Sequence, residues 1–297
     1  HTRLPLFAEL KACFDQAASH HAVVCRVSGE QGVGKTGLVR EFIRRLKREG
    51  QPHALKGRCY EWERVPYKAL DGVVDNMTRV LRRNPGLMTS HISDDELACL
   101  AMIFPVVLRV DALAREPSAD CLSWSRNRRE AAALDGFCAL LRVLSEQAPV
   151  LLFLDDVQWA DVQSAAFLSQ AIVNVNDCRV LTLLCDAGVV GGYIQTTRRL
   201  LRRVNIEMVE LSVKPLPLDE AAAVAGSLLR LPTHRDVVQQ IARNSEGAPA
   251  RILELSRLEL SRGSTHAGRS TAAGLDSVMK ATLDELPAQA NRLLHLI

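Results

Sequence analysis

Residues 29–36 read Gly-Glu-Gln-Gly-Val-Gly-Lys-Thr, a complete match to the pattern G-x-x-x-x-G-K-S/T. The glycines allow the backbone to wrap so that its N–H groups point inward, toward phosphate oxygens. We expect Lys35 to reach the β- and γ-phosphates of a nucleotide and the Thr36 hydroxyl to bind magnesium. A string of this kind arises by chance in about one chain in a hundred of this length. The alternative, a Gly-rich turn that happens to contain Lys, is therefore disfavoured.

The segments on either side of the loop provide the context that a P-loop requires. An apolar run of strand length, residues 21–28, precedes the loop, and apolar residues repeat at helical spacing over 38–46 after it. The positive N-terminal end of that helix would add to phosphate binding. A second short strand is predicted at 54–59. Strand, loop, helix and strand in this order form the βαβ unit of a parallel sheet.

The remaining chain continues this α/β pattern and then becomes helical. Buried strands are predicted at 150–154, 180–185 and 206–211; helices are predicted over 6–18, most of 68–147, 219–229, 234–242 and 249–260. We predict an α/β P-loop core over residues 1–213, with a parallel sheet and flanking helices, and a separate helical region over 214–262. Residues 263–275 are rich in Ser, Gly, Thr and Ala and are predicted to be a flexible linker.

Composition and charge narrow the class of protein. The chain has 297 residues and a net charge of +3, so charge alone gives no argument for nucleic-acid binding, which we do not expect of this segment. Its eight cysteines include no C-x-x-C pair and are predicted to be buried, reduced thiols. We find no signal peptide and no apolar run of membrane-spanning length, and we expect a cytoplasmic protein without membrane contact. The first residue, His1, and a helical pattern interrupted at Ile297 suggest a piece of a larger protein.

Two adjacent carboxylates, Asp155 and Asp156, follow the strand predicted at 150–154. In a P-loop architecture a carboxylate at this strand end lies beside the loop and can hold magnesium, directly or through water. Two neighbouring carboxylates are costly there unless a cation or solvent offsets their repulsion. We assign Asp155 to magnesium, together with Thr36, and Asp156 to positioning or polarising the attacking water. The alternative is that the two residues merely cap the next helix.

The chain resembles the AAA-type ATPase module of STAND signalling proteins, found in bacterial regulators and beside serine/threonine kinase domains. The resemblance covers nearly the whole chain; it is carried by the P-loop, by residues 57–61 (Gly-Arg-Cys-Tyr-Glu), 66–69 (Pro-Tyr-Lys-Ala), 154–161 (Leu-Asp-Asp-Val-Gln-Trp-Ala-Asp) and 245–254 (Ser-Glu-Gly-Ala-Pro-Ala-Arg-Ile-Leu-Glu). It implies an ATPase core, a helical lid over 214–262 and a winged-helix domain, of which 276–297 would be the truncated start. It also implies partners within a longer protein, such as a kinase domain or helical repeats, and self-association that depends on nucleotide.

The resemblance adds one residue of the lid to the predicted nucleotide site. Pro249 would contact the base or ribose and report whether ADP or ATP is bound. The alternative interpretation of Gly247-Ala248-Pro249 is a helix end followed by a helix start, with Pro in the first turn. The full predicted cofactor-binding set is Gly29, Glu30, Gln31, Gly32, Val33, Gly34, Lys35, Thr36, Gly37 and Pro249, and the catalytic pair is Lys35 with Asp156. Trp159 is expected to be a packing residue and Asp161 a helix cap.

Two departures from the family pattern bear on hydrolysis. The family carries an Arg just past the fourth strand that senses the γ-phosphate, whereas residues 184–189 here read Leu-Cys-Asp-Ala-Gly-Val. We expect Asp186 to repel phosphate if it faces the site. Arg198 and Arg199 are candidates to replace the missing Arg, or else part of a solvated helix face. Residues 5–10 also lack the Gly-Arg that the family places beside the adenine.

Three functions fit these observations. The leading hypothesis is a signal-transduction ATPase that changes conformation between ADP and ATP and hydrolyses ATP slowly. The second is a nucleotide-binding scaffold with little or no turnover, which the missing Arg would allow. The third is a P-loop kinase that phosphorylates a small molecule. No second substrate lid with clustered arginines follows the P-loop, which argues against the kinase, whereas the Asp-Asp pair suits activation of water.

Overall fold

The computed structural model describes residues 3–19, 21–50, 52–61, 65–87, 92–188, 192–203, 206, 208–229 and 235–263. Almost all of the predicted linker and the whole predicted start of a winged-helix domain, residues 276–297, lie outside these ranges. By their contacts the residues form two compact units: one runs through Val213, and the other begins at Lys214 and also includes Gly32–Gly34.

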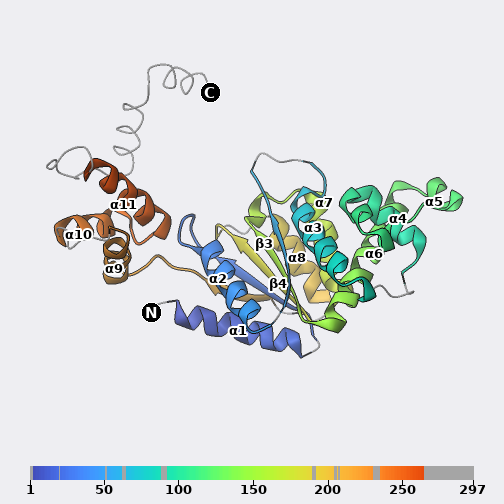
Figure 1. The fold of residues 1–297 in the computed structure, drawn as a ribbon, viewed down its shortest axis with the longest axis horizontal. Helices are drawn as coiled ribbons and strands as arrows, with labels where there is room; N and C mark the ends of the chain where they lie inside the picture. The colour runs from blue at the N-terminus through green and yellow to red at the C-terminus, as the bar shows by residue number, and fades with distance from the viewer. Residues whose placement is uncertain are drawn as a thin grey trace, which may run out of the picture. The chain divides into compact units, whose positions relative to one another are not determined.

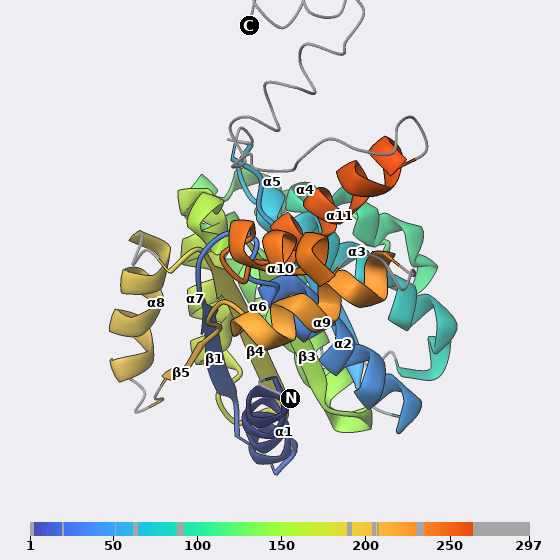
Figure 2. The same ribbon diagram turned by 90° about the vertical axis from the view of Figure 1, so that its left-hand side faces the viewer.

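A five-stranded parallel sheet forms the centre of the first unit. Its strands are β1 (Val23–Ser28), β2 (His53–Arg58), β3 (Val150–Asp155), β4 (Val180–Asp186) and β5 (Met208–Ser212). They pair in the order β2-β3-β4-β1-β5, and the last four can be followed side by side in Figure 2. Every residue of β3 and β4 is buried, as expected for parallel strands covered on both faces. The predicted α/β parallel-sheet fold is therefore confirmed, with strand ends shifted by one or two residues.

Eight α-helices of the described chain accompany the sheet (Figure 1); they are α1 (Leu4–Ala18), α2 (Lys35–Arg48), α3 (Lys68–Arg83), α4 (Asp94–Ile103), α5 (Ala119–Ser123), α6 (Arg126–Gln147), α7 (Val162–Asn174) and α8 (Gly192–Arg203). Short 3-10 turns lie at η1 (Pro85–Leu87), η2 (Pro105–Arg109), η3 (Asp111–Leu113) and η4 (Val157–Trp159). α3 packs on β2 and β3, while α1 packs on β1 and β4. The apolar faces of α3, α4, α6, α7 and α8 share one core with buried residues of β1, β2, β3 and β4.

The helices between β2 and β3 pack closely on one another. α4 begins with a capping box between Ser93 and Glu96, which satisfies the first free N–H groups of the helix. α6 approaches α4 so closely that a Cβ on Gly136 would lie 2.9 Å from the backbone oxygen of Glu96. Aromatic rings then join this region to the helices beside the sheet: Tyr67, Phe104, Phe137 and Phe167 meet edge to face.

The described part of the second unit contains three helices, α9 (Leu218–Leu229), α10 (Arg235–Asn244) and α11 (Pro249–Gly263). They enclose a small apolar core of their own, built mainly from alanine, leucine and isoleucine. Gly247, between α10 and α11, has φ +73°, and a Cβ there would lie 2.1 Å from the Leu216 backbone oxygen. Only glycine therefore fits this turn, which the Leu216 N–H closes by donating to the Gly247 carbonyl at 2.8 Å.

The cysteines and the helices also bear on the predicted class of protein. All eight cysteines are free and buried, as predicted. Among the helices that the structure describes, none combines the length and the apolar character needed to cross a bilayer.

Candidate functional site

The predicted P-loop joins the end of β1 to the start of α2. β1 ends at Ser28 and α2 begins at Lys35, so residues 29–34 make the whole connection. Gly32 and Gly34 have φ of +84° and +95°, a backbone conformation that L side chains rarely adopt. The loop therefore needs glycine at these positions, and it leads directly into the N-terminal end of α2, where backbone N–H groups are free for an anion.

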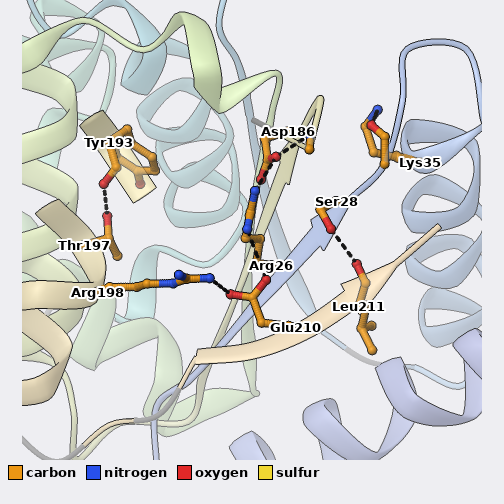
Figure 3. Close-up of polar contacts among 11 residues, drawn as sticks. Arg26, Ser28, Lys35, Asp186, Tyr193, Thr197, Arg198, Glu210 and Leu211 are labelled. Atoms are coloured by element: carbon orange, nitrogen blue, oxygen red, sulfur yellow. Dashed lines mark hydrogen bonds and ion pairs between the residues drawn. The ribbon is translucent and has the colours of Figure 1, made fainter. Parts of the chain in front are cut away.

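Lys35 is held by the loop itself. Its Nζ donates to the carbonyl oxygens of Gly29, at 2.8 Å, and Glu30, at 2.9 Å, and the residue is only 7% exposed. Figure 3 shows this side chain beside the loop. Among the residues that the structure describes, the ammonium group thus has neutral carbonyl partners and no carboxylate. A phosphate group, with its negative charge, would be a stronger partner for it than a neutral carbonyl.

Thr36 and Asp155 meet although 119 residues separate them in sequence. The Thr36 hydroxyl donates to Asp155 Oδ1 at 3.0 Å. Asp155 is 2% exposed, and its other oxygen, Oδ2, is buried without a hydrogen-bond partner among the residues the structure describes. Burial raises the pKa of the Asp155 carboxyl, and the bond from Thr36 opposes part of this rise. The carboxylate is therefore under-compensated and suited to an external cation.

This pair of oxygen ligands fits Mg²⁺. The ion prefers carboxylate and hydroxyl oxygens, retains several waters, and is commonly held by one or two protein ligands together with nucleotide phosphates. Within the described ranges no group of three or more His, Cys, Asp or Glu residues could hold a metal by itself. Thr36 and Asp155 would thus hold Mg²⁺ jointly with a bound nucleotide.

Asp156 differs from its neighbour in both backbone and partner. It has φ 56° and ψ 42°, a left-handed conformation that is uncommon for a residue other than glycine. Its Oδ2 accepts from Arg58 Nε at 3.2 Å and Arg58 Nη2 at 3.1 Å. Its side chain makes no capping hydrogen bond to η4, so the helix-cap alternative is not supported. The strained backbone turns this carboxylate away from the course of β3 and toward the end of β2.

The end of β4 contains a buried ion pair where the family pattern has an Arg. Arg26, on β1, donates from Nε and Nη2 to the two oxygens of Asp186, at 2.5 and 2.8 Å. Asp186 is fully buried, and its Oδ1 also accepts from the Gly188 N–H at 2.7 Å. Figure 3 shows the guanidinium lying between Asp186 and Glu210 of β5. The expectation that Asp186 would repel phosphate is wrong, because Arg26 neutralises its charge within the sheet.

Arg198, one of the two candidates to replace the missing Arg, is also engaged in this network. It reaches from α8 to Glu210, whose other oxygen accepts from Arg26 Nη1 at 3.2 Å (Figure 3). Arg198 therefore belongs to a polar chain along β5, β1 and β4. Arg199 is exposed on α8.

Comparison with known proteins identifies the family. A sequence profile of the AAA ATPase domain matches residues 2–183. The chain belongs to the AAA ATPase domain family. No curated protein matches it.

Solved structures place this AAA ATPase domain among similar folds. The Walker-type ATPase PABY2304 of Pyrococcus abyssi aligns over 95% of this chain and 71% of its own, with a TM-score of 0.55 and 14% identity. Domain III of the Thermotoga maritima replication initiation protein DnaA aligns over 90% of this chain and 87% of its own, with a TM-score of 0.51 and 12% identity. Cdc6p of Pyrobaculum aerophilum aligns over 88% of this chain and 62% of its own, with a TM-score of 0.51 and 13% identity. At these identities the likeness concerns the fold.

In this AAA ATPase domain, two further predictions concern the segment after Asp156. Asp161 caps α7, accepting from the Ser164 N–H at 2.7 Å, as predicted. Trp159 is 42% exposed, so its prediction as a packing residue is wrong. The reason is that η4 is a short 3-10 turn which buries Val157 and leaves the ring of Trp159 outside.

Sequence reasoning missed two arginines in the AAA ATPase domain, Arg26 and Arg58. Arg58 ends β2, in register with Asp155, and so reaches Asp156 across the sheet. Its signal in the sequence is an Arg at the last position but one of the strand predicted at 54–59. Pro249 starts α11 in the second unit, consistent with a first-turn proline, and its contact with nucleotide remains a prediction.

Proposed function

We propose that this AAA ATPase domain binds Mg-ATP and acts as a nucleotide-dependent conformational switch that hydrolyses ATP slowly. The observation that carries the proposal is the meeting of Thr36 with Asp155 below the P-loop, with one carboxylate oxygen buried and unpartnered within the described chain. A bound Mg²⁺ would supply positive charge for the β- and γ-phosphates. Lys35 would exchange its two loop carbonyls for phosphate oxygens.

In this proposal Asp156 orients the water that attacks the γ-phosphate. Its carboxylate is partly exposed and adjacent to Asp155, so a water can approach it. Arg58 already binds that carboxylate through two nitrogens and therefore competes with the water for its oxygens. The neutralised Asp186 at the end of β4 offers no positive charge to the γ-phosphate. An arginine at a phosphoryl-transfer site is worth about 10³ to 10⁵ in rate, so we expect turnover below about one per second.

The Arg58–Asp156 pair also favours a second candidate, a scaffold that binds nucleotide without turnover. If Arg58 keeps its hold on Asp156 after ATP binds, no carboxylate is available to the water. The two candidates share the binding site and differ only in phosphate release. Only the switch proposal requires an input signal, an output domain and self-association that depends on nucleotide; the scaffold proposal requires none of them.

The first test compares Lys35→Ala with the parent by calorimetry, with magnesium and ATP. Loss of the ammonium group should abolish measurable ATP binding while the far-UV circular dichroism stays unchanged. Lys47→Ala, which removes an exposed lysine from the same helix, is the matched control. Equal ATP affinity in Lys35→Ala and the parent would contradict the assignment of the P-loop.

The second test measures phosphate release in single turnover at several protein concentrations, beside hydrogen exchange in the ADP and ATP states. A slow switch releases phosphate at less than about one per second, and its backbone amides exchange differently in the ADP and ATP states. Absence of phosphate release selects the scaffold. Fast release that is independent of concentration would overturn slow turnover, because an internal residue would then complete the site.

A further inference from the structure

A cavity lies among the helices between β2 and β3, and no residue of the P-loop lines it. Its volume is about 330 Å³, at the small end of ligand pockets. Two helical faces form its walls, each with residues spaced three and four apart, as neighbours on a helix surface are. α4 contributes Cys99, Met102 and Ile103; α6 contributes Arg126, Arg129 and Glu130; and Tyr67, just before α3, completes the lining.

The charges of this cavity are unbalanced toward positive. Arg126 donates to Glu130 at 2.8 Å, which neutralises that pair. Arg128 is the next arginine on α6. Its guanidinium carbon lies 4.2 Å from the centroid of the Trp124 ring, so this side chain is held by a cation–π contact. Arg129 is half-buried, and its side chain makes no hydrogen bond or ion pair with any residue that the structure describes. One guanidinium is therefore left to face the cavity without a counter-charge.

The opposite wall is apolar and partly open. Met102 is 44% exposed, which is unusual for a large apolar side chain unless something covers it. Ile103, its neighbour, is half-buried, and Cys99 is buried at the base of the cavity. An apolar wall facing an unpaired guanidinium suits a ligand with an apolar body and one negative charge.

We propose that this cavity binds a small organic carboxylate, with the charge on Arg129 and the apolar body on Met102 and Ile103, and that the bound ligand regulates the nucleotide site through Tyr67. The Tyr67 ring contacts the rings of Phe104 and Phe167, at 6.1 and 5.8 Å between centroids. Burial, followed by hydrogen bonding with Glu130, raises the pKa of its hydroxyl to about 12, so the hydroxyl stays neutral.

The backbone of Tyr67 provides the link to the nucleotide site. Tyr67 has φ 63°, the left-handed region that is strained for a bulky residue, and its N–H donates to Asp161 Oδ1 at 3.2 Å. The same oxygen caps α7, five residues after Asp156. A ligand that moves the Tyr67 ring therefore acts on the turn that holds Asp156. This regulatory part rests on the proposed function, whereas ligand binding does not.

The binding test uses benzoate as the probe and benzamide, its neutral counterpart, with ligand-detected NMR on the nucleotide-free protein. For a ligand of this size we expect a Kd in the ~millimolar range for benzoate and at least about tenfold weaker binding of benzamide. Arg129→Gln should weaken benzoate about tenfold. Met102→Glu, which places a negative charge in the wall, should do the same. Arg48→Gln, with the same charge change on an exposed arginine of α2, should leave it unchanged.

Equal binding of benzoate and benzamide, or benzoate affinity unaffected by Arg129→Gln and Met102→Glu, would overturn the binding site.

Regulation is tested by the Kd of Mg-ATP with and without saturating benzoate, and by the reciprocal shift in benzoate affinity, which must match it. We expect a shift of at least about threefold. Identical ATP affinity would overturn the regulatory role. If the parent does not bind ATP at all, the proposed function fails, while benzoate binding to the free protein still decides the site.

Discussion

β3 and β4 lie side by side, and each ends in a buried aspartate with a different set of partners. Asp186, at the end of β4, receives two hydrogen bonds from Arg26 and one from the Gly188 N–H. Asp155, at the end of β3, receives one bond from Thr36, and its Oδ2 has no partner within the described residues. Both residues are at most 2% exposed. The two aspartates are alike in burial and charge, and they differ in whether a cation of the protein neutralises that charge.

This difference separates a carboxylate that serves the fold from one that is available to a ligand. A buried charge is costly unless it is paired and hydrogen-bonded. The sheet supplies the cation for Asp186 from its own strand β1, so nothing further is needed there. For Asp155 we propose that the cation comes from outside, as Mg²⁺ bound together with a nucleotide. Substitutions at the two sites should therefore have opposite consequences for the nucleotide-free protein.

The largest effect is expected for Asp186→Ala, which leaves Arg26 buried with only the partly exposed Glu210. Breaking a buried pair by removing one partner costs about 3–5 kcal/mol, so the urea midpoint should fall steeply. The control is the double variant Arg26→Met with Asp186→Leu, which removes both charges and should recover most of the stability. A single variant as stable as the parent would show that this ion pair does not support the sheet.

The next effect concerns catalysis at the β3 end. Asp156→Asn should retain Mg-ATP affinity and slow single-turnover hydrolysis by about 100-fold or more, since loss of an acid–base group typically costs 10² to 10⁴. Asp111→Asn, a change of the same kind at an exposed residue of η3, is the control. If Asp156→Asn lost binding as well as hydrolysis, the separate roles of Asp155 and Asp156 would be wrong.

The smallest effects are expected for Asp155→Asn. Its Mg-ATP affinity should fall about tenfold, the value of one hydrogen-bonded charged contact, as measured by calorimetry with and without magnesium. The nucleotide-free variant should be as stable as the parent or slightly more stable near neutral pH. This result is opposite in sign to that of Asp186→Ala.

The pH dependence follows from the raised pKa of Asp155. The folded state holds the proton of the Asp155 carboxyl more tightly than the unfolded state does. Protonated Asp155 therefore adds to the free energy of unfolding, and this contribution is fully present below the unfolded pKa of 3.8. It is lost as the pH rises through the folded pKa. Urea unfolding without magnesium, from about pH 4 to about pH 7, should show this loss in the parent and a smaller loss in Asp155→Asn. Parallel curves for the two proteins would show that burial does not perturb this carboxyl.

The parts of the site that could be predicted from the sequence are those written in contiguous residues. The P-loop is a single string, and the Asp155–Asp156 pair follows an apolar run typical of a buried strand, so the sequence alone predicts both as parts of the candidate site. The sheet was found for the same reason, because each buried strand is a short apolar segment. Its order required the structure, since several parallel orders fit the same segments.

The arginine partners could not be found in this way, because they depend on strand register over long separations. Arg26 and Asp186 lie 160 residues apart, and Arg58 and Asp156 lie 98 apart. Within its strand Arg26 looks like a polar interruption of an apolar run. Only the pairing of Arg26 with Glu210 and Leu184 brings its side chain to Asp186. Trp159 was misjudged for a similar reason, since its exposure depends on a turn of three residues.

The position of β1 in the sheet has a consequence for synthesis of the chain on the ribosome. β1 carries the P-loop and is made first, yet both strands that pair with it, β4 and β5, are made last. Parallel pairing between segments so distant in sequence forms slowly and only after the intervening chain exists. The strand that presents the P-loop therefore has no strand neighbour until residue 186 has emerged, and has both neighbours only after residue 212. We therefore expect a nascent chain to gain affinity for nucleotide only near the end of translation of the core. A stalled product that lacks β4 and β5 should not bind ATP.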